Sequence, residues 1–260
     1  MQPIGVFDSG VGGISVLKHI RALLPQEDLL YFADSRYAPY GNKSQEFICE
    51  RSFYLADFLI EQGAKALVVA CNTATAAAIG ALREKYDLPI IGMEPAIKPA
   101  AAATRTGVVG VLATVGTLQS AQFAALLENY GQGVKVVTEG CPGLVECIER
   151  GELETSETRD LLEGYLKPLL HAGADTIVLG CTHYPFVRPL IEEIVGFDIT
   201  LIDTGAAVAR QLQKRLSEST LFNQSRVSGC VRFWSNSSSG DVEKVVLRLW
   251  GEQAELSLSA

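Results

Sequence analysis

The sequence predicts an α/β protein built from two similar parallel-sheet domains. Short apolar runs alternate with longer segments of helical spacing along nearly the whole chain. This alternation is typical of parallel sheets that are covered by helices on both faces. A weak internal repeat also relates two stretches about 110 residues apart, and each places a cysteine after its aliphatic run. The repeat indicates that the two halves of the chain share an architecture.

Eight apolar runs are the expected strands. They are Ile4–Phe7, Leu29–Phe32, Ala66–Val69, Ile90–Gly92, Val108–Leu112, Val134–Val137, Thr176–Leu179 and Ile199–Ile202. The spacing of apolar residues predicts helices at Ile48–Gln62, Gln119–Tyr130, Arg159–Ala172 and Ala206–Leu216. Ligand groups gather at the carboxyl ends of strands in such sheets, so the residues that follow each strand are the first candidates for function.

The segment after residue 208 has no counterpart in the repeat, and we expect it to pack onto the first domain. It contains a candidate strand between Arg226 and Trp234, a Ser-rich loop at Asn236–Ser239 and a short amphipathic helix at Val242–Trp250. The sequence therefore predicts a first domain of residues 1–96 with 209–260, and a second domain of residues 97–208.

The repeat places two cysteines in equivalent positions. Residues 63–73, GAKALVVACNT, align with residues 173–183, GADTIVLGCTH, so Cys71 and Cys181 each end a strand. A second pair, residues 5–9 with residues 110–114, follows the same order. Parallel strands resemble one another in many proteins, but two matches in order and at similar spacing favour two related domains.

Composition narrows the class of protein. The 260 residues are 48% hydrophobic, and the formal net charge of −8 disfavours a general attraction to nucleic acid. The amino-terminal MQPIGVFDSG has no secretory signal pattern, and no apolar run reaches the roughly 20 residues of a membrane helix. We expect a cytoplasmic protein with no nucleic-acid or membrane partner, whose six cysteines remain reduced.

Cys71 and Cys181 are the candidate reagents. Both would lie near helix N-termini, where the helix dipole favours a thiolate. A single buried cysteine is often only core filling, but two in equivalent positions suggest a shared task. Inversion of a carbon centre requires a base on one face and an acid on the other. Two opposed thiols can serve as the base and as the acid near neutral pH.

Other chemistries would use some of the same residues. Cys181 and His183 could form an acyl-transfer nucleophile and base, which leaves Cys71 without a task. A zinc site could combine both cysteines with His183 and Asp8, although the close Cys-x2-Cys pair of structural zinc sites does not occur. A disulfide oxidoreductase would show Cys-x-x-Cys, which is also absent.

Polar residues at the other strand ends suit an amino-acid ligand. Asp8 could orient a substrate ammonium group or accept protons near Cys71. Glycines 10, 12 and 13 follow it without a dinucleotide or Walker pattern, and they would let backbone N–H groups approach a carboxylate. Uncharged groups that could bind carboxylates, or simply cap helices, are Asn72, Thr73, Thr114, Thr117 and Thr182. Glu146 and His183 are candidate auxiliaries beside Cys181. The default interpretation of Glu146 is an ordinary surface residue.

Six blocks of sequence resemble the glutamate racemase family. They are GVFDSGVGG at residues 5–13, DSRYAPYG at 34–41, VVACNTATA at 68–76, GMEPA at 92–96, LATVGTLQS at 112–120 and LGCTHYP at 179–185. The resemblance implies two flavodoxin-like domains with the active site between them. It also implies interconversion of L- and D-glutamate for peptidoglycan synthesis without pyridoxal phosphate or metal, and a homodimer.

The resemblance also assigns roles to individual residues. Cys71 is expected to act as the base on the D-isomer and Cys181 as the base on the L-isomer. Asp8 would assist Cys71, whereas Glu146 and His183 would assist Cys181. The implied substrate-binding residues are Ser9, Pro39, Tyr40, Gly41, Asn72, Thr73, Thr114, Thr117 and Thr182. An aspartate racemase and a binding protein that has lost its activity remain the rival hypotheses.

Overall fold

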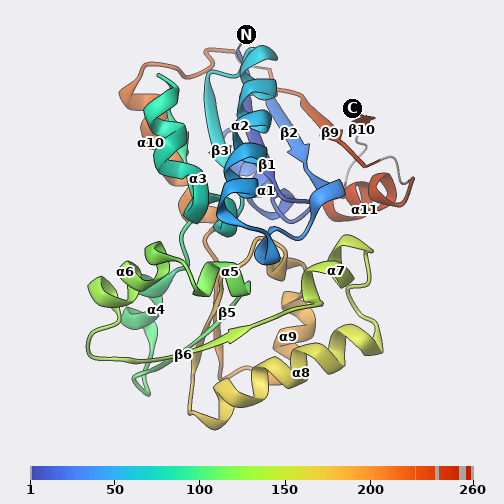
Figure 1. Cartoon of the computed structure of the whole chain (residues 1–260). Coiled ribbons are helices and arrows are strands. Elements are labelled where there is room, and N and C mark those ends of the chain that lie inside the picture. The colour runs from blue at the N-terminus through green and yellow to red at the C-terminus, as the bar shows by residue number, and fades with distance from the viewer. Residues whose placement is uncertain (1, 226, 238–239, 252–255, 259–260) are drawn as a thin grey trace.

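The computed structural model describes residues 2–225, 227–237, 240–251 and 256–258. Two separate parallel sheets form two lobes, one above the other in Figure 1. The first sheet has the strand order β10-β9-β2-β1-β3-β4, and the second has the order β6-β5-β7-β8. All of their paired strands run parallel. The predicted fold class is therefore confirmed.

The eight predicted strands are all present. The first sheet contains β1 (Ile4–Asp8), β2 (Leu29–Ala33), β3 (Ala66–Val69), β4 (Ile90–Ile91), β9 (Val231–Ser235) and β10 (Leu256–Leu258). The second contains β5 (Val108–Ala113), β6 (Lys135–Gly140), β7 (Thr176–Leu179) and β8 (Thr200–Ile202). Strand β6 continues three residues beyond its predicted end. It lies at a sheet edge and is only partly buried, so its polar residues are tolerated there.

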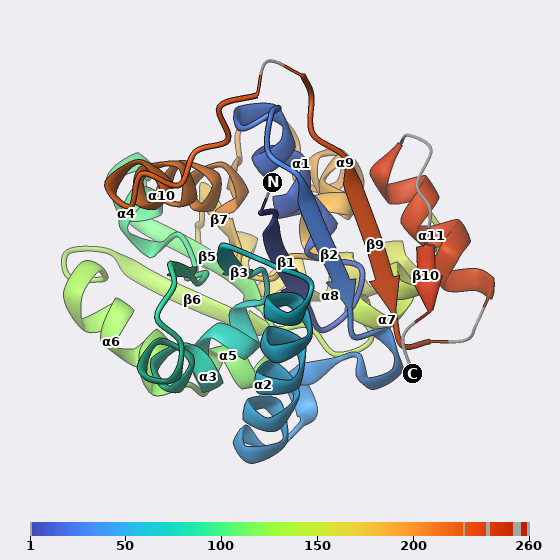
Figure 2. The same ribbon diagram turned by 90° about the horizontal axis from the view of Figure 1, so that it is seen from above.

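Helices cover both faces of each sheet (Figures 1 and 2). On the first sheet these are α1 (Ile14–Leu23), α10 (Gly205–Glu218) and α11 (Gly240–Trp250) on one face, and α2 (Gln45–Glu61) and α3 (Asn72–Lys85) on the other. On the second sheet they are α7 (Leu144–Glu149), α8 (Ser156–His171) and α9 (Arg188–Val195) opposite α4 (Ile97–Ala103) and α6 (Ala121–Tyr130). In the described part of the chain, none of the helices combines the length and apolarity needed to cross a membrane.

The helix predicted at Gln119–Tyr130 corresponds to α6, which begins two residues later than predicted, at Ala121. A separate short helix, α5 (Val115–Leu118), comes before it, and Gln119 and Ser120 lie between the two helices. The Ser120 hydroxyl accepts a hydrogen bond from the Phe123 N–H (3.1 Å), which caps α6 at its N-terminus. The predicted N-terminal boundary is wrong because a serine favours a cap over a position inside a helix.

The C-terminal segment packs onto the first sheet, as expected. Strand β9 pairs with β2 along its whole length, and α10 and α11 pack against α1. Residues 226 and 238–239, parts of the predicted strand segment and Ser-rich loop, lie outside the described residues. The division into residues 1–96 with 209–260 and residues 97–208 is kept as a proposal, which this sheet membership supports.

Candidate active site between the two lobes

The carboxyl ends of strands from both sheets meet at a small buried cavity of about 10 Å³. It is lined by Ser9, Pro39, Tyr40, Gly41, Cys71, Asn72, Thr73, Thr114, Val145, Gly180, Cys181, Thr182 and His183. The sequence singled out all of these except Val145 and Gly180. Asp8 and Thr117 lie directly behind the lining, hydrogen bonded to Thr182 (3.5 Å) and Thr73 (3.2 Å) respectively. A cavity of this volume has room for about one water molecule.

Cys71 lies two residues beyond the end of β3 and caps helix α3. Its Sγ accepts a hydrogen bond from the Ala74 N–H (3.5 Å) and lies 3.7 Å from the Ser9 hydroxyl. Burial raises the pKa of the Cys71 thiol well above its ordinary value, and the charge of Asp8 raises it further. In this closed arrangement Cys71 is therefore a protonated thiol, which is a proton donor.

Asp8 connects the first lobe to the second. Its carboxylate accepts hydrogen bonds from the Gly13 N–H (2.8 Å) and, across the lobe boundary, from the Thr182 hydroxyl (3.5 Å). The side chain is completely buried. Burial raises the pKa of Asp8, an effect that the nearby His183 opposes.

Cys181, His183 and Glu149 form a chain of polar contacts. Cys181 lies two residues beyond the end of β7. Its Sγ lies 3.6 Å from His183 Nδ1, while His183 Nε2 lies 2.6 Å from Glu149 Oε1. Burial by itself lowers the pKa of His183. The hydrogen bonds to Cys181 and Glu149 outweigh burial and raise this pKa well above its ordinary value. His183 is thus held as an imidazolium beside the Cys181 sulfur.

The carboxylate beside His183 belongs to Glu149 and not to Glu146. Glu146 lies one turn earlier on α7 and lines a separate, more open pocket of about 360 Å³. Glu149 instead accepts hydrogen bonds from the Val11 N–H (2.7 Å) of the first lobe as well as from His183. Sequence patterns alone do not choose between two acids three residues apart, because the start of the six-residue α7 was not predicted.

Uncharged polar groups from both lobes also lie at the cavity. The hydroxyl of Thr73, from the first lobe, lies 2.9 Å from that of Thr114 and 3.2 Å from that of Thr117, both from the second. Both polar side-chain atoms of Asn72 are buried without a partner in the described part of the protein. A buried unpaired amide is costly, so Asn72 is well suited to bind a polar ligand.

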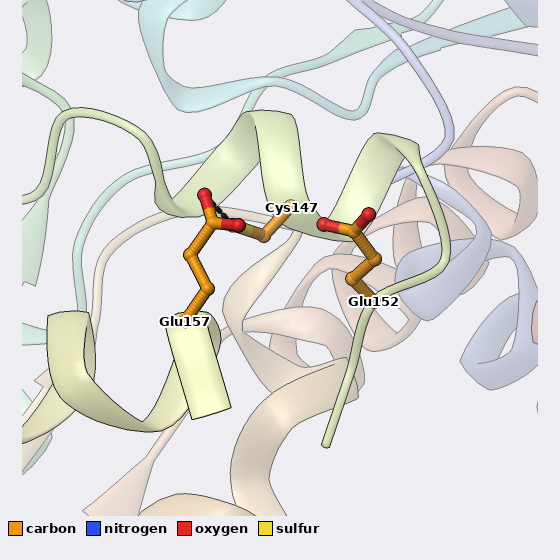
Figure 3. Close-up of side chains that lie close together, drawn as sticks. All are labelled: Cys147, Glu152 and Glu157. Carbon is orange, nitrogen blue, oxygen red and sulfur yellow. Dashed lines mark hydrogen bonds between the residues drawn. The ribbon is translucent and has the colours of Figure 1, made fainter. Parts of the chain in front are cut away.

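The zinc hypothesis gains no support from the geometry. Among the described residues, the metal-ligating side chains that lie close together are Cys147, Glu152 and Glu157, shown in Figure 3. The guanidinium of Arg150 already contacts all three, at 3.5 Å from the sulfur, 2.6 Å from Glu152 and 3.4 Å from Glu157. This cation donates to both carboxylates and balances one of their two charges, so the cluster is explained without a metal.

Comparisons with known proteins agree with the motifs. The sequence profile of the Asp/Glu/hydantoin racemase family matches residues 4–212. The chain is 59% identical to the glutamate racemase of Ectopseudomonas mendocina, over 98% of this chain and 97% of that protein. The resemblance to glutamate racemases is therefore confirmed.

Solved structures show the same architecture over the full length. A glutamate racemase isoform from Bacillus anthracis superposes with a TM-score of 0.90 at 34% identity, covering 100% of this chain and 97% of that one. The Escherichia coli glutamate racemase, solved with L-glutamate and the activator UDP-MurNAc-Ala, has a TM-score of 0.89 at 34% identity, covering 100% and 99%. The chain belongs to the Asp/Glu/hydantoin racemase family.

Proposed function

We propose that this protein is a glutamate racemase that moves the Cα proton between Cys71 and Cys181 without a cofactor. The observation that carries the proposal is that two thiols, from equivalent strand ends of opposite lobes, line one cavity. A base and an acid on opposed walls are what inversion of a carbon centre requires. The glutamate racemases at 57–59% identity support glutamate as the substrate.

The protonated Cys71 thiol suits the proposed conversion of L- to D-glutamate, in which it is the acid. In this direction Cys181, beside the His183 imidazolium, acts as the thiolate base, takes the Cα proton and becomes a thiol. The electron pair stays on the substrate as a carbanion that its carboxylate delocalises. The Cys71 thiol then donates its proton to the opposite face, which leaves D-glutamate and a Cys71 thiolate. The reverse reaction exchanges the two roles.

The surrounding groups orient the substrate and stabilise developing charge. Asn72 and the threonine hydroxyls offer donors to the substrate carboxylates. Asp8 interacts with the Cys71 side chain and suits an ammonium group, whereas Glu149 fixes His183 beside Cys181. The closed cavity keeps water away from the reacting carbon, which strengthens each of these polar contacts.

Single replacement of each cysteine tests the proposal. Cys71→Ala and Cys181→Ala should each abolish racemisation of both enantiomers while the circular dichroism spectrum and the melting temperature remain near those of the wild type. In heavy water the wild type should place deuterium at Cα of glutamate. Normal turnover by either variant would refute the two-thiol mechanism.

The rival substrate requires its own assay. An aspartate racemase would share both cysteines, so initial rates on both enantiomers of glutamate and aspartate decide between them. A higher kcat/KM on aspartate would overturn the assignment of glutamate. A binding protein without activity would bind the ligand in calorimetry and incorporate no deuterium.

The wider setting belongs to the same proposal. We place the enzyme in the cytoplasm as a homodimer that supplies D-glutamate for peptidoglycan. Light scattering during gel filtration tests the dimer, with a mass of 28.0 kDa expected for a monomer and twice that for a dimer. Rescue by D-glutamate of bacteria depleted of the protein tests the role in the cell wall.

A further inference from the structure

The carboxylate of Asp34 is the centre of a buried network that ends at the cavity wall. Asp34 follows β2 and is completely buried. It accepts hydrogen bonds from Arg51 Nη2 (2.6 Å) and Nε (3.0 Å), from Asn236 Nδ2 (2.6 Å) and from the Tyr40 hydroxyl. Four donors from three segments thus meet on one carboxylate.

Tyr40 transmits this arrangement to the site. Its ring is 1% exposed and lines the cavity beside Pro39 and Gly41. Burial, together with Asp34, raises the pKa of Tyr40, so the phenol stays protonated and donates to the carboxylate. Gly41 packs so closely on the second lobe that an added Cβ would lie 2.8 Å from Thr114. A shift of Tyr40 would therefore move the cavity wall directly.

Asn236 brings the C-terminal segment into the network. It follows β9 and lies beyond residue 212, where the match to the family profile ends. While its Nδ2 donates to Asp34, its Oδ1 accepts the Arg36 N–H (3.0 Å). Both ends of the amide are used, which fixes its orientation. Asn236 therefore contacts the segment between β2 and Tyr40 at two points.

We propose that Asp34 and Asn236 are positioning residues for the racemase reaction, which hold the Pro39–Tyr40–Gly41 edge of the cavity in place through the Tyr40 hydroxyl. The C-terminal segment thereby contributes to the binding of substrate without touching it. This inference rests on the proposed function, because it assigns Tyr40 to the substrate-binding wall.

Removal of Asn236 is the most selective perturbation. Arg51 still neutralises Asp34 in its absence through two hydrogen bonds, so no buried charge is left unpaired. The remaining loss is one donor to the carboxylate that sets the position of Tyr40. We expect the effect to fall on substrate binding and to leave the chemistry at the two sulfurs nearly intact.

Asn223 provides a matched control in the same segment. Its Nδ2 also donates to the first lobe at 2.6 Å, to the Gln26 carbonyl, and it is also half-buried. Gln26 lies in the loop before β2, at the opposite end of that strand from the cavity. Asn236→Ala and Asn223→Ala therefore each remove one amide donor to the first lobe, from a carboxylate in the first case and from a neutral carbonyl in the second, and only the first is linked to Tyr40.

The experiment measures KM, kcat, the dissociation constant of D-glutamate by calorimetry and the melting temperature of both variants. Asn236→Ala should raise KM and the dissociation constant about three- to tenfold, less than the full effect of a hydrogen bond to a charged group because Asn236 acts on the substrate only through Tyr40, with kcat within about twofold. Asn223→Ala should leave KM, kcat and the dissociation constant unchanged. Asn236→Asp should not restore binding, because it places a second carboxylate against Asp34.

A double replacement tests the route through Tyr40. If Asn236 acts by way of the phenol, Asn236→Ala should add little to the KM of Tyr40→Phe, since both remove the same support. Full additivity, or equal effects of the two asparagine variants, would overturn the proposal. A lower melting temperature with an unchanged dissociation constant would show a merely structural role. Calorimetry separates this failure from failure of the proposed function, which would appear as a wild type that binds glutamate without racemising it.

Discussion

Replacement of Glu149 by glutamine is the sharpest test of how the site is organised. The Glu149→Gln variant would keep the size of the side chain and an oxygen for the Val11 N–H, but it would lose the charge beside His183. The carboxylate is 13% exposed and the imidazole 1%, so solvent screens this pair little. We expect the imidazolium to be less favoured and the pKa of His183 to fall.

The size of the effect follows from the contact that is weakened. A hydrogen bond to a charged group contributes about 1.5 to 3 kcal/mol, which corresponds to a loss of roughly ten- to a hundredfold in kcat/KM if all of it acts in the transition state. The assay follows optical activity from each enantiomer. Because the two enantiomers have equal free energies, kcat/KM must fall equally in both directions.

The pH dependence of stability gives an independent readout. The pKa of His183 is raised on folding, so its protonation stabilises the native state below the unfolded value of about 6.5. This stability is lost as the pH rises through the folded pKa. Glu149→Gln should reduce the pH-dependent contribution of His183 to stability, which is measured as the change of the urea midpoint with pH. Glu146→Gln, on the same helix, should leave activity and midpoint unchanged. The reverse ranking of the two variants would refute this organisation.

Three further outcomes follow from packing and burial. An added Cβ on Gly12 would lie 2.3 Å from the His183 ring, so Gly12→Ala should lower kcat/KM at least tenfold. The control Gly80→Ala, in open space on α3, should keep normal activity and stabilise the protein by about 1 kcal/mol. Lys65→Ala breaks a buried ion pair with Glu27 at 2.6 Å and should lower the free energy of urea unfolding by about 3 to 5 kcal/mol. Lys85→Ala breaks an exposed ion pair, so its urea midpoint should hardly move. Alkylation of Cys71 by iodoacetamide, followed by mass spectrometry, should still accelerate above pH 9, because burial raises the pKa of this thiol; a plateau below that pH would contradict its placement.

The fold could be predicted because its strands are buried on both faces. Runs such as Ala66–Val69 and Thr176–Leu179 are fully buried, and their aliphatic sequence reports that burial directly. Edge and polar elements carry weaker signals. Strand β6 is partly exposed, and the six-residue α7 is too short to show a period of 3.6 residues.

The site could be predicted where it depends on strand ends and could not where it depends on helix rotation. Asp8 is the last residue of β1, Cys71 and Cys181 each follow a strand by two residues, and the topology alone brings strand ends together. Whether Glu146 or Glu149 faces His183 depends on how α7 is turned about its axis. That rotation depends on where α7 begins, which is set by Gly143 with its φ of 87°. The sequence does not reveal this backbone conformation. The contribution of Asn236 depends on how the chain returns to the first sheet, which lies outside any local pattern.

The small volume of the cavity has a consequence for ligand binding. A cavity of about 10 Å³ is too small for glutamate, so the site has to widen before glutamate enters, and contacts between the lobes such as Ser15 Oγ to the Thr182 carbonyl (2.8 Å) oppose that widening. If the receptive form is a minor population, the measured affinity is weaker than the intrinsic one by the fraction that is open. Association of the substrate is then slowed because it can bind only after the open form has appeared. Solvent viscosity or osmotic pressure should therefore change the rate of turnover.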